Sequence, residues 1–84
     1  MVGQLTDLVR AHQLSADHRD LILQSRLCAC FHCLRAFPPV TIEEWVDDGH
    51  TALCPYCHDE TLLPDVGLTL NYHFLRTMRE FWLE

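Results

Sequence analysis

The sequence contains no lysine and few positive charges of any kind. Its 6 basic residues are all arginines, and 12 aspartates and glutamates outnumber them, which gives a formal net charge of −6. Proteins that bind nucleic acids neutralise phosphates with clustered lysine and arginine side chains. Scattered arginines on an acidic chain therefore do not favour a nucleic acid, and the expected partner is a protein with a basic surface.

Long apolar runs are also missing from the chain. No segment approaches the roughly 18 consecutive apolar residues that a membrane helix requires. Residues 1–10 show neither the basic region nor the apolar region of a secretory signal. We therefore expect a cytoplasmic protein that has no membrane partner.

The chain is too short for a complex architecture. Its 84 residues are enough for a single domain, 1–84. They are too few to form two cores or a deep catalytic cleft. A hydrophobic content of 49% with 21% charged residues is typical of a globular protein. We expect a small folded domain that is not an enzyme.

Five cysteines are many for so short a chain. Four of them form two Cys-x-x-Cys pairs, Cys30 with Cys33 and Cys54 with Cys57, and 20 residues separate the pairs. This spacing is typical of a four-cysteine zinc site, in which each turn brings two sulfurs to one metal ion. Disulfides fit less well, because five is an odd number and the cytoplasm is reducing. We predict a structural Zn²⁺ ion, with iron as the alternative metal.

The roles of Cys28 and of three nearby histidines stay open in the sequence. Cys28 precedes Cys30 by two residues, and we expect a small buried residue beside the site, with replacement of one of the four ligands as the alternative. His32 lies inside the first pair, His58 follows the second, and His50 lies between the pairs. Each is expected at the surface or beside the ligands.

The tetrapeptide Cys54-Pro-Tyr-Cys57 is also that of the glutaredoxin active site. Glutaredoxins carry it near the start of the chain, whereas only 27 residues follow Cys57 here. That remainder is too short for the rest of the glutaredoxin fold. A thiol redox or metal-sensing role, with Cys28 as a reactive thiol, is kept as the second alternative function.

Apolar periodicity and capping residues predict the local structure. The N-terminal part, 1–27, is expected to hold two amphipathic helices, over 1–14 and 15–25, with Ser15 as the N-cap of the second. Thr41 and Glu44 fit a capping box, which predicts a short helix through Val46. The Asp47-Asp48-Gly49 sequence is expected to turn the chain.

The second half of the chain gives further signals. Thr51 to Cys57 is expected on a short hairpin, and 28–58 forms the zinc-site segment. A C-terminal helix is predicted over 70–83, with Asn71 as its N-cap and a hydrophobic staple between Leu70 and Leu75. We expect its apolar stripe to be buried against the helix of 15–25; the stripe comprises Phe74, Leu75, Met78 and Trp82.

Several of these residues together resemble a group of small, uncharacterised bacterial cytoplasmic proteins. The resemblance spans about residues 15–83, and its most specific stretch is Thr51-Ala-Leu-Cys-Pro-Tyr-Cys57. The other positions that carry it are His18-Arg19, Ser25, Cys28-x-Cys30-Phe-x-Cys33, Phe37-x-Pro39, Ile42-x-Glu44-Trp45-x-Asp47, Phe74-Leu75, Met78 and Trp82.

This resemblance implies a treble-clef or zinc-ribbon-like zinc site, and it implies no known activity. The matching ligands are Cys30, Cys33, Cys54 and Cys57. The chain departs from the group at His58, where glycine is usual, and in the loop of 59–67.

Together these observations predict a small, zinc-stabilised α+β domain in which packed helices surround the zinc knuckles. The predicted function is a structural-zinc protein-interaction module, such as an acidic adaptor, inhibitor or immunity-type protein. The alternative is a nucleic-acid-binding zinc ribbon, which would use the arginines and exposed aromatic residues. The acidic cluster that favours the first function comprises Glu43, Glu44, Asp47, Asp48, Asp59 and Glu60.

Overall fold

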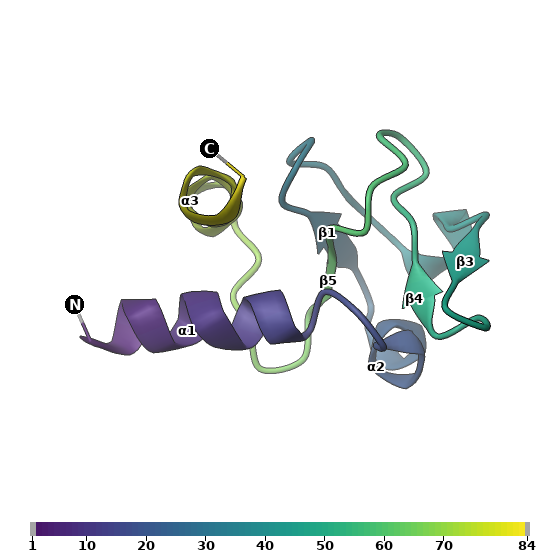
Figure 1. Cartoon of the computed structure of the whole chain (residues 1–84), viewed down its shortest axis with the longest axis horizontal. Helices are drawn as coiled ribbons and strands as arrows, with labels where there is room; N and C mark the ends of the chain where they lie inside the picture. Colours follow the sequence, from purple (N-terminus) through teal and green to yellow (C-terminus); the bar gives the residue numbers. More distant parts are fainter. Residues whose placement is uncertain (1, 84) are drawn as a thin grey trace.

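The computed structural model describes residues 2–83, and within them the side chains of residues 6–83. Met1 and Glu84, the ends of the predicted domain, lie outside the described part. α-Helices at the two ends of the chain flank a run of short antiparallel strands (Figure 1), so the structure is α+β as predicted. The elements are α1 (Val2–Gln13), α2 (Arg19–Gln24), β1 (Cys28–Cys30), β2 (Ala36–Phe37), the 3-10 helix η1 (Pro39–Thr41), β3 (Trp45–Val46), β4 (Thr51–Ala52), β5 (Leu62–Pro64) and α3 (Tyr72–Trp82).

A three-stranded antiparallel sheet, in the order β2-β1-β5, lies between two small hydrophobic clusters. Neighbouring residues of a strand point to opposite faces of the sheet. Cys28 and Cys30 therefore belong to one cluster and Ala29 to the other, and Leu62 and Leu63 of β5 divide in the same way. The sheet thus divides the interior into two hydrophobic clusters, whereas the short length of the chain had suggested a single core.

Helices α1 and α3 cover the face of the sheet that carries Ala29 and Leu63 (Figure 1). α1 contributes Leu8 and Ala11 to this first cluster, with exposed fractions of 5% and 0%. Ile22 of α2 belongs instead to the second cluster, which also holds the cysteines. The sequence assigned both helices to one N-terminal part, but in the structure they pack against opposite faces of the sheet.

The C-terminal helix α3 was predicted to pack against the helix of 15–25, and this prediction is wrong. Trp82 of α3 donates its indole N–H to the carbonyl of Leu8 at 3.2 Å. Its ring stacks on His12, with centroids 3.9 Å apart. Both partners lie in α1. Periodicity identifies the buried face of a helix, whereas the long-range topology of the chain decides which surface that face meets.

The start of α3 agrees with the sequence prediction. The Asn71 side chain accepts a hydrogen bond from the Phe74 N–H at 2.8 Å, as an N-cap does. Leu70 packs against the cluster that contains Leu75, in agreement with the predicted hydrophobic staple. Leu75 and Met78 are buried, but Phe74 and Trp82 are only half-buried.

The helix predicted from Thr41 through Val46 is absent. Pro39 instead begins η1, which ends at Thr41, and the chain then runs extended into β3. Trp45 pairs with Ala52 of β4 and packs against the second cluster. Aromatic and β-branched residues favour strands. Packing of the Trp45 indole against the second cluster outweighs a capping box, which only local contacts would support.

The N-cap predicted at Ser15 is also wrong. The Ser15 hydroxyl donates to the His12 carbonyl at 2.6 Å, so it closes α1 and does not open α2. Asp17 then adopts a left-handed conformation, with φ 49°, and α2 begins at Arg19. The turn between the helices is therefore longer than the sequence suggested.

Hairpin β3–β4 and α2 lie on the far side of the sheet from α1 and α3 (Figure 1). The predicted turn is present: Asp47, Asp48 and Gly49 all have positive φ, at 55°, 57° and 89°. Aspartate and glycine tolerate this conformation better than other residues. The hairpin leads directly from β4 into the second cysteine pair.

Candidate metal centre

The first cysteine pair forms a tight turn between β1 and β2. The Cys30 N–H donates to the Arg35 carbonyl at 2.9 Å, and the Leu34 N–H returns to the Cys30 carbonyl at 2.9 Å. The N–H groups of His32 and Cys33 point at the Cys30 Sγ, at 3.3 and 3.4 Å. Backbone donors of this kind stabilise a thiolate, because they hydrogen-bond its charged form.

The second pair repeats this geometry. The Cys54 N–H donates to the Asp59 carbonyl at 3.0 Å, and the His58 N–H donates to the Cys54 carbonyl at 2.9 Å. The Tyr56 N–H points at the Cys54 Sγ at 3.4 Å. We call these two turns, residues 30–35 and 54–59, the first and second knuckles.

Each knuckle requires a left-handed residue directly after its second cysteine. Leu34 and His58 occupy these positions, with φ 64° and 65°. Neither is glycine, which adopts this conformation without a steric penalty. Glycine at position 58 is therefore the residue that this turn would favour.

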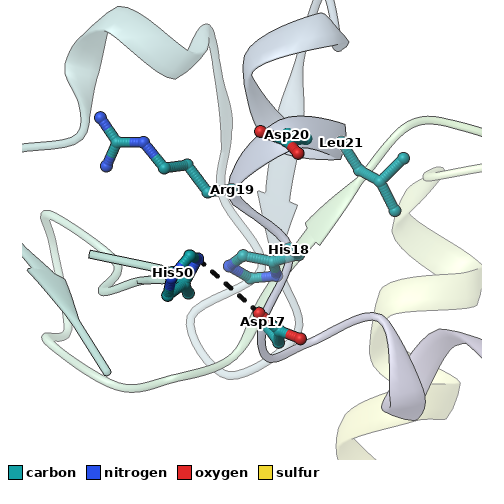
Figure 2. Close-up of a pocket in the computed structure, with 6 residues that line it drawn as sticks. All are labelled: Asp17, His18, Arg19, Asp20, Leu21 and His50. Carbon is teal, nitrogen blue, oxygen red and sulfur yellow. Dashed lines mark ion pairs between the residues drawn. The ribbon is translucent and has the colours of Figure 1, made fainter. Parts of the chain in front are cut away.

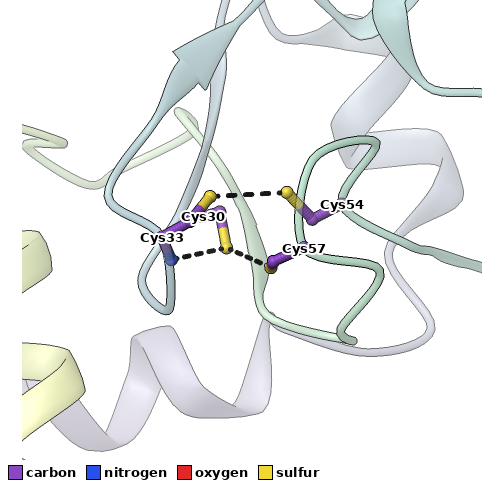
Figure 3. Close-up of side chains that lie close together, drawn as sticks. All are labelled: Cys30, Cys33, Cys54 and Cys57. Carbon is purple, nitrogen blue, oxygen red and sulfur yellow. Dashed lines mark hydrogen bonds between the residues drawn. The ribbon is translucent and has the colours of Figure 1, made fainter.

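The four cysteines of the knuckles form one compact cluster (Figure 3). Cys30 Sγ lies 3.5 Å from Cys57 Sγ, and Cys33 Sγ lies 3.6 Å from Cys54 Sγ, so each of these contacts joins one knuckle to the other. All four sulfurs lie within 4.8 Å of one another. A tetrahedral ion with Zn–S bonds of about 2.3 Å spaces its sulfurs about 3.8 Å apart. The cluster could hold such an ion.

The acidity of the cluster is set by burial and by the knuckle N–H groups. Burial raises the pKa of the Cys30 and Cys57 thiols to about 11 and also raises that of Cys33. Burial opposes ionisation of Cys54 as well, but the N–H groups of Cys57 and Tyr56 outweigh it and lower the Cys54 pKa. A metal cation bound here would supply the charge that lets all four sulfurs ionise, and its binding would release protons.

Cys28 is fully buried and lies on the same face of β1 as Cys30. Residues two apart in a strand are separated by roughly 6–7 Å, which is too far for a pair of ligands held by one knuckle. Its Sγ contacts the Phe37 carbonyl at 3.3 Å. Burial also raises the pKa of its thiol to about 12, and such a thiol is unreactive at neutral pH.

His18 is the residue beside the site that sequence reasoning did not single out. Its ring is 1% exposed and bridges two elements: Nδ1 lies 2.7 Å from the Leu14 carbonyl, and Nε2 accepts the Ala52 N–H at 3.0 Å. These partners require the neutral ring with its proton on Nδ1. Burial lowers the His18 pKa, which favours the same form. His18 thus fixes β4 two residues before Cys54.

Polar contacts around His18 complete the attachment of the hairpin. The Asp17 N–H donates to the Thr51 hydroxyl at 2.8 Å, and that hydroxyl donates to Asp47 at 2.9 Å. Arg19 donates to the Gly49 carbonyl at 2.9 Å and lies 4.6 Å from the centre of the Trp45 ring. Most residues of this network belong to the sequence pattern on which the family resemblance depends. No other feature of the sequence indicated the network.

A polar hollow of about 330 Å³ lies beside this network (Figure 2). Within it, His50 and Asp17 form an exposed ion pair with 3.9 Å between Nδ1 and the carboxylate. The remaining predicted histidines are also exposed: His58 lies 3.9 Å from Glu44 and His32 lies 2.5 Å from Asp59. The lining residues of the hollow are Asp17, His18, Arg19, Asp20, Leu21 and His50.

Comparison of the chain with protein-family models, with curated proteins and with solved structures found no match. The family resemblance therefore stays a prediction, and the functional argument depends on the residues themselves. Within the described part of the chain, no helix is both long enough and apolar enough to cross a membrane.

Proposed function

We propose that the four-cysteine cluster holds a structural zinc ion and that the protein is a small protein-interaction module. The observation that carries the proposal is the pairing of sulfurs across the two knuckles, at 3.5 and 3.6 Å. Four thiolates fill the coordination sphere of zinc and leave no position for a reactive water, which supports a structural role and not an enzymatic one. Because both cysteine pairs lie in turns, a zinc-ribbon-like site is favoured over a treble clef.

The size of the protein explains why a metal is needed. Among the side chains that the structure describes, each face of the sheet carries a cluster of seven buried residues, and short chains bury too little surface to be stable on that basis alone. Binding of structural zinc contributes roughly 10–16 kcal/mol, and this free energy is coupled to folding. The ion would join the β1–β2 turn to the segment after β4, which are distant in sequence.

An acidic surface beside the second knuckle is the proposed interaction site. The Glu44 carbonyl accepts the Leu53 N–H at 3.0 Å, and its carboxylate faces His58, so the hairpin and the second knuckle adjoin. Tyr56 of the same knuckle is 48% exposed and offers an aromatic anchor. All the acids of this surface are exposed: Glu43, Glu44, Asp47, Asp48, Asp59 and Glu60.

A basic protein surface is the partner that fits this charge. Loading zinc onto four thiolates would lower the formal charge from −6 to about −8. Two arginines border this surface, since Arg19 donates to the Gly49 carbonyl and Arg35 lies 4.4 Å from the centre of the Tyr56 ring, but the six acids of the surface outnumber them. This arrangement does not favour the nucleic-acid alternative.

Elemental analysis and ligand substitution test the metal. We expect about one zinc per chain, and we expect a strong chelator to unfold the protein. A Cys→Ser change at any of the four clustered cysteines should abolish zinc binding. Cys28→Ser is the matched control, because serine retains a donor toward the Phe37 carbonyl, and it should keep the zinc. Metal-free protein with an unchanged melting temperature would contradict the proposal.

Charge reversal tests the acidic surface. Glu43→Lys/Glu60→Lys is the informative variant, since Asp47 accepts the Thr51 hydroxyl and Asp48 is held at positive φ. Asp7→Lys/Glu80→Lys changes the net charge equally, on α1 and α3. Proteins captured from the native host at low salt should be lost with the first variant and retained with the second. Equal capture by both, or salt-sensitive binding of wild type to DNA or RNA, would refute this surface.

A further inference from the structure

A second group of metal-binding side chains lies at the exposed edge of the four-cysteine cluster. His32 comes from the first knuckle, and Cys57 and Asp59 come from the second. One donor atom from each of the three lies within 4.8 Å of the others. Nitrogen, sulfur and oxygen donors therefore converge from both knuckles on one point, and the single sulfur donor, Cys57, also belongs to the four-cysteine cluster.

The knuckles themselves hold these donors in place. The His32 N–H points at the Cys30 Sγ at 3.3 Å, and the Asp59 carbonyl accepts the Cys54 N–H at 3.0 Å. Both residues are thus fixed by the backbone that folds around the first ion. Their side chains remain open to solvent, with exposed fractions of 46% for His32 and 51% for Asp59. A hydrated ion could reach them without any opening of the core.

Charge also favours a cation at this edge. Four thiolates and one divalent ion leave the cluster with a net charge of about −2, and Asp59 adds a further negative charge beside it. Cys57 is only half-buried, unlike the buried Cys30 and Cys54. Cys33 is half-buried as well, but within the described part of the chain it is the Cys57 sulfur that lies within 4.8 Å of donor atoms of His32 and Asp59, so an outer ion could share this thiolate with the inner ion.

We propose that His32, Cys57 and Asp59 form a second, weaker site for a divalent transition metal of the zinc class, bridged to the first ion through the Cys57 sulfur. This inference depends on the proposed ion at the four-cysteine cluster. Three protein ligands leave one coordination position open for water or for a donor from a partner protein. A structural zinc site, in contrast, has all four positions filled by the protein.

The present geometry needs only a small adjustment. The His32 Nδ1 now lies 2.5 Å from an oxygen of the Asp59 carboxylate. An ion with bonds of about 2.0–2.1 Å in a tetrahedral arrangement spaces such atoms about 3.4 Å apart. A shift of the two exposed side chains by about 1 Å meets this requirement, and any proton on the His32 Nδ1 is released to solvent when the ion binds.

Calorimetric titration with Zn²⁺ tests the site in protein that already contains one zinc per chain by elemental analysis. Wild type should bind one further ion, with a Kd in the micromolar range. His32→Gln and Asp59→Asn each keep a hydrogen-bonding side chain, and each should weaken this second binding by at least about tenfold. Retention of the first zinc in both variants shows that their knuckles are intact.

The matched control is the other exposed imidazole–carboxylate pair, His50 with Asp17. Within the described part of the chain, this pair does not belong to a group of metal-binding side chains that includes a cysteine. His50→Gln/Asp17→Asn should leave both binding steps unchanged. With cadmium in both sites, the two cadmium NMR signals should show coupling through the shared sulfur.

Three results would overturn the inference. Wild type could take up no second ion under excess zinc, the second ion could survive unchanged in the His32 and Asp59 variants, or two cadmium signals could lack coupling. Absence of the first zinc would instead contradict the proposed structural site, and elemental analysis detects that failure before the titration begins.

Discussion

Replacement of His18 by leucine should strongly destabilise the protein, although the residue lies outside the cysteine cluster. Leucine fills a similar volume but makes no hydrogen bonds, so the Leu14 carbonyl and the Ala52 N–H both lose a partner. His18 is 1% exposed, and water cannot replace it without local opening. An unpaired buried backbone group costs about 1–3 kcal/mol, so the two together should cost about 2–6 kcal/mol.

The same replacement should also change how stability depends on pH. The folded-state pKa of His18 lies below its ordinary value of 6.5, because burial disfavours the charged ring. Above pH 6.5 the ring is neutral in both states, and its full contribution is present. As the pH falls from 6.5 through the folded-state pKa, the unfolded state binds a proton first and the contribution is lost. The difference between wild type and variant should therefore shrink on acidification.

Urea unfolding of the zinc-loaded proteins, at several pH values and a fixed zinc concentration, measures both effects. Because His18 holds the strand that leads into Cys54, the zinc content of both proteins is measured at each pH, and only pH values at which both retain zinc are compared. His50→Leu is the control, because the His50 ring is exposed. His50 contacts the start of α2 through its backbone carbonyl, which the substitution keeps. A loss below about 1 kcal/mol for His18→Leu, or a difference that grows as the pH falls, would refute the assigned hydrogen bonds and tautomer.

Two further substitutions test the packing and the knuckle geometry. Leu75→Ala should lower the free energy of unfolding by about 2–5 kcal/mol, as for other truncations of buried leucines, whereas Tyr72→Ala on the exposed side of α3 should change it by less than about 0.5 kcal/mol. Equal losses would contradict the described face of the helix. His58→Gly should raise the free energy of unfolding by about 0.5–1 kcal/mol, because the relief of left-handed strain exceeds the entropic cost of glycine. His58→Ala, which keeps the Cβ, should show no such gain, and a gain with alanine would show that the side chain and not the backbone is responsible.

Local signals in the sequence were reliable where a short segment decides its own structure. The two Cys-x-x-Cys pairs identified the cluster, since a knuckle is closed by hydrogen bonds within six residues. Asn71 capped α3 as predicted, because an N-cap needs a partner only three residues away. The turn at Asp47 and Asp48 followed from residues that tolerate positive φ.

Local signals failed where other partners compete with the predicted one. Thr41 and Glu44 satisfy the pattern of a capping box, but pairing of Trp45 with β4 produces a strand there. In this case packing against another part of the chain outweighed a cap worth about 1 kcal/mol. Ser15 could cap the following helix, yet its hydroxyl donates to the carbonyl of His12, three residues back, and closes the preceding helix.

By itself the sequence determined which four cysteines form the cluster, the acidic character of the protein and the apolar face of α3, because spacing, charge and periodicity are properties of the chain. Only the tertiary structure decided that α3 lies on α1, that His18 attaches the hairpin, and that His32 and Asp59 meet beside Cys57. Each of these contacts joins residues at least 25 positions apart. No local pattern encodes such a contact, since it arises only when the sheet and the two knuckles bring the separate segments together.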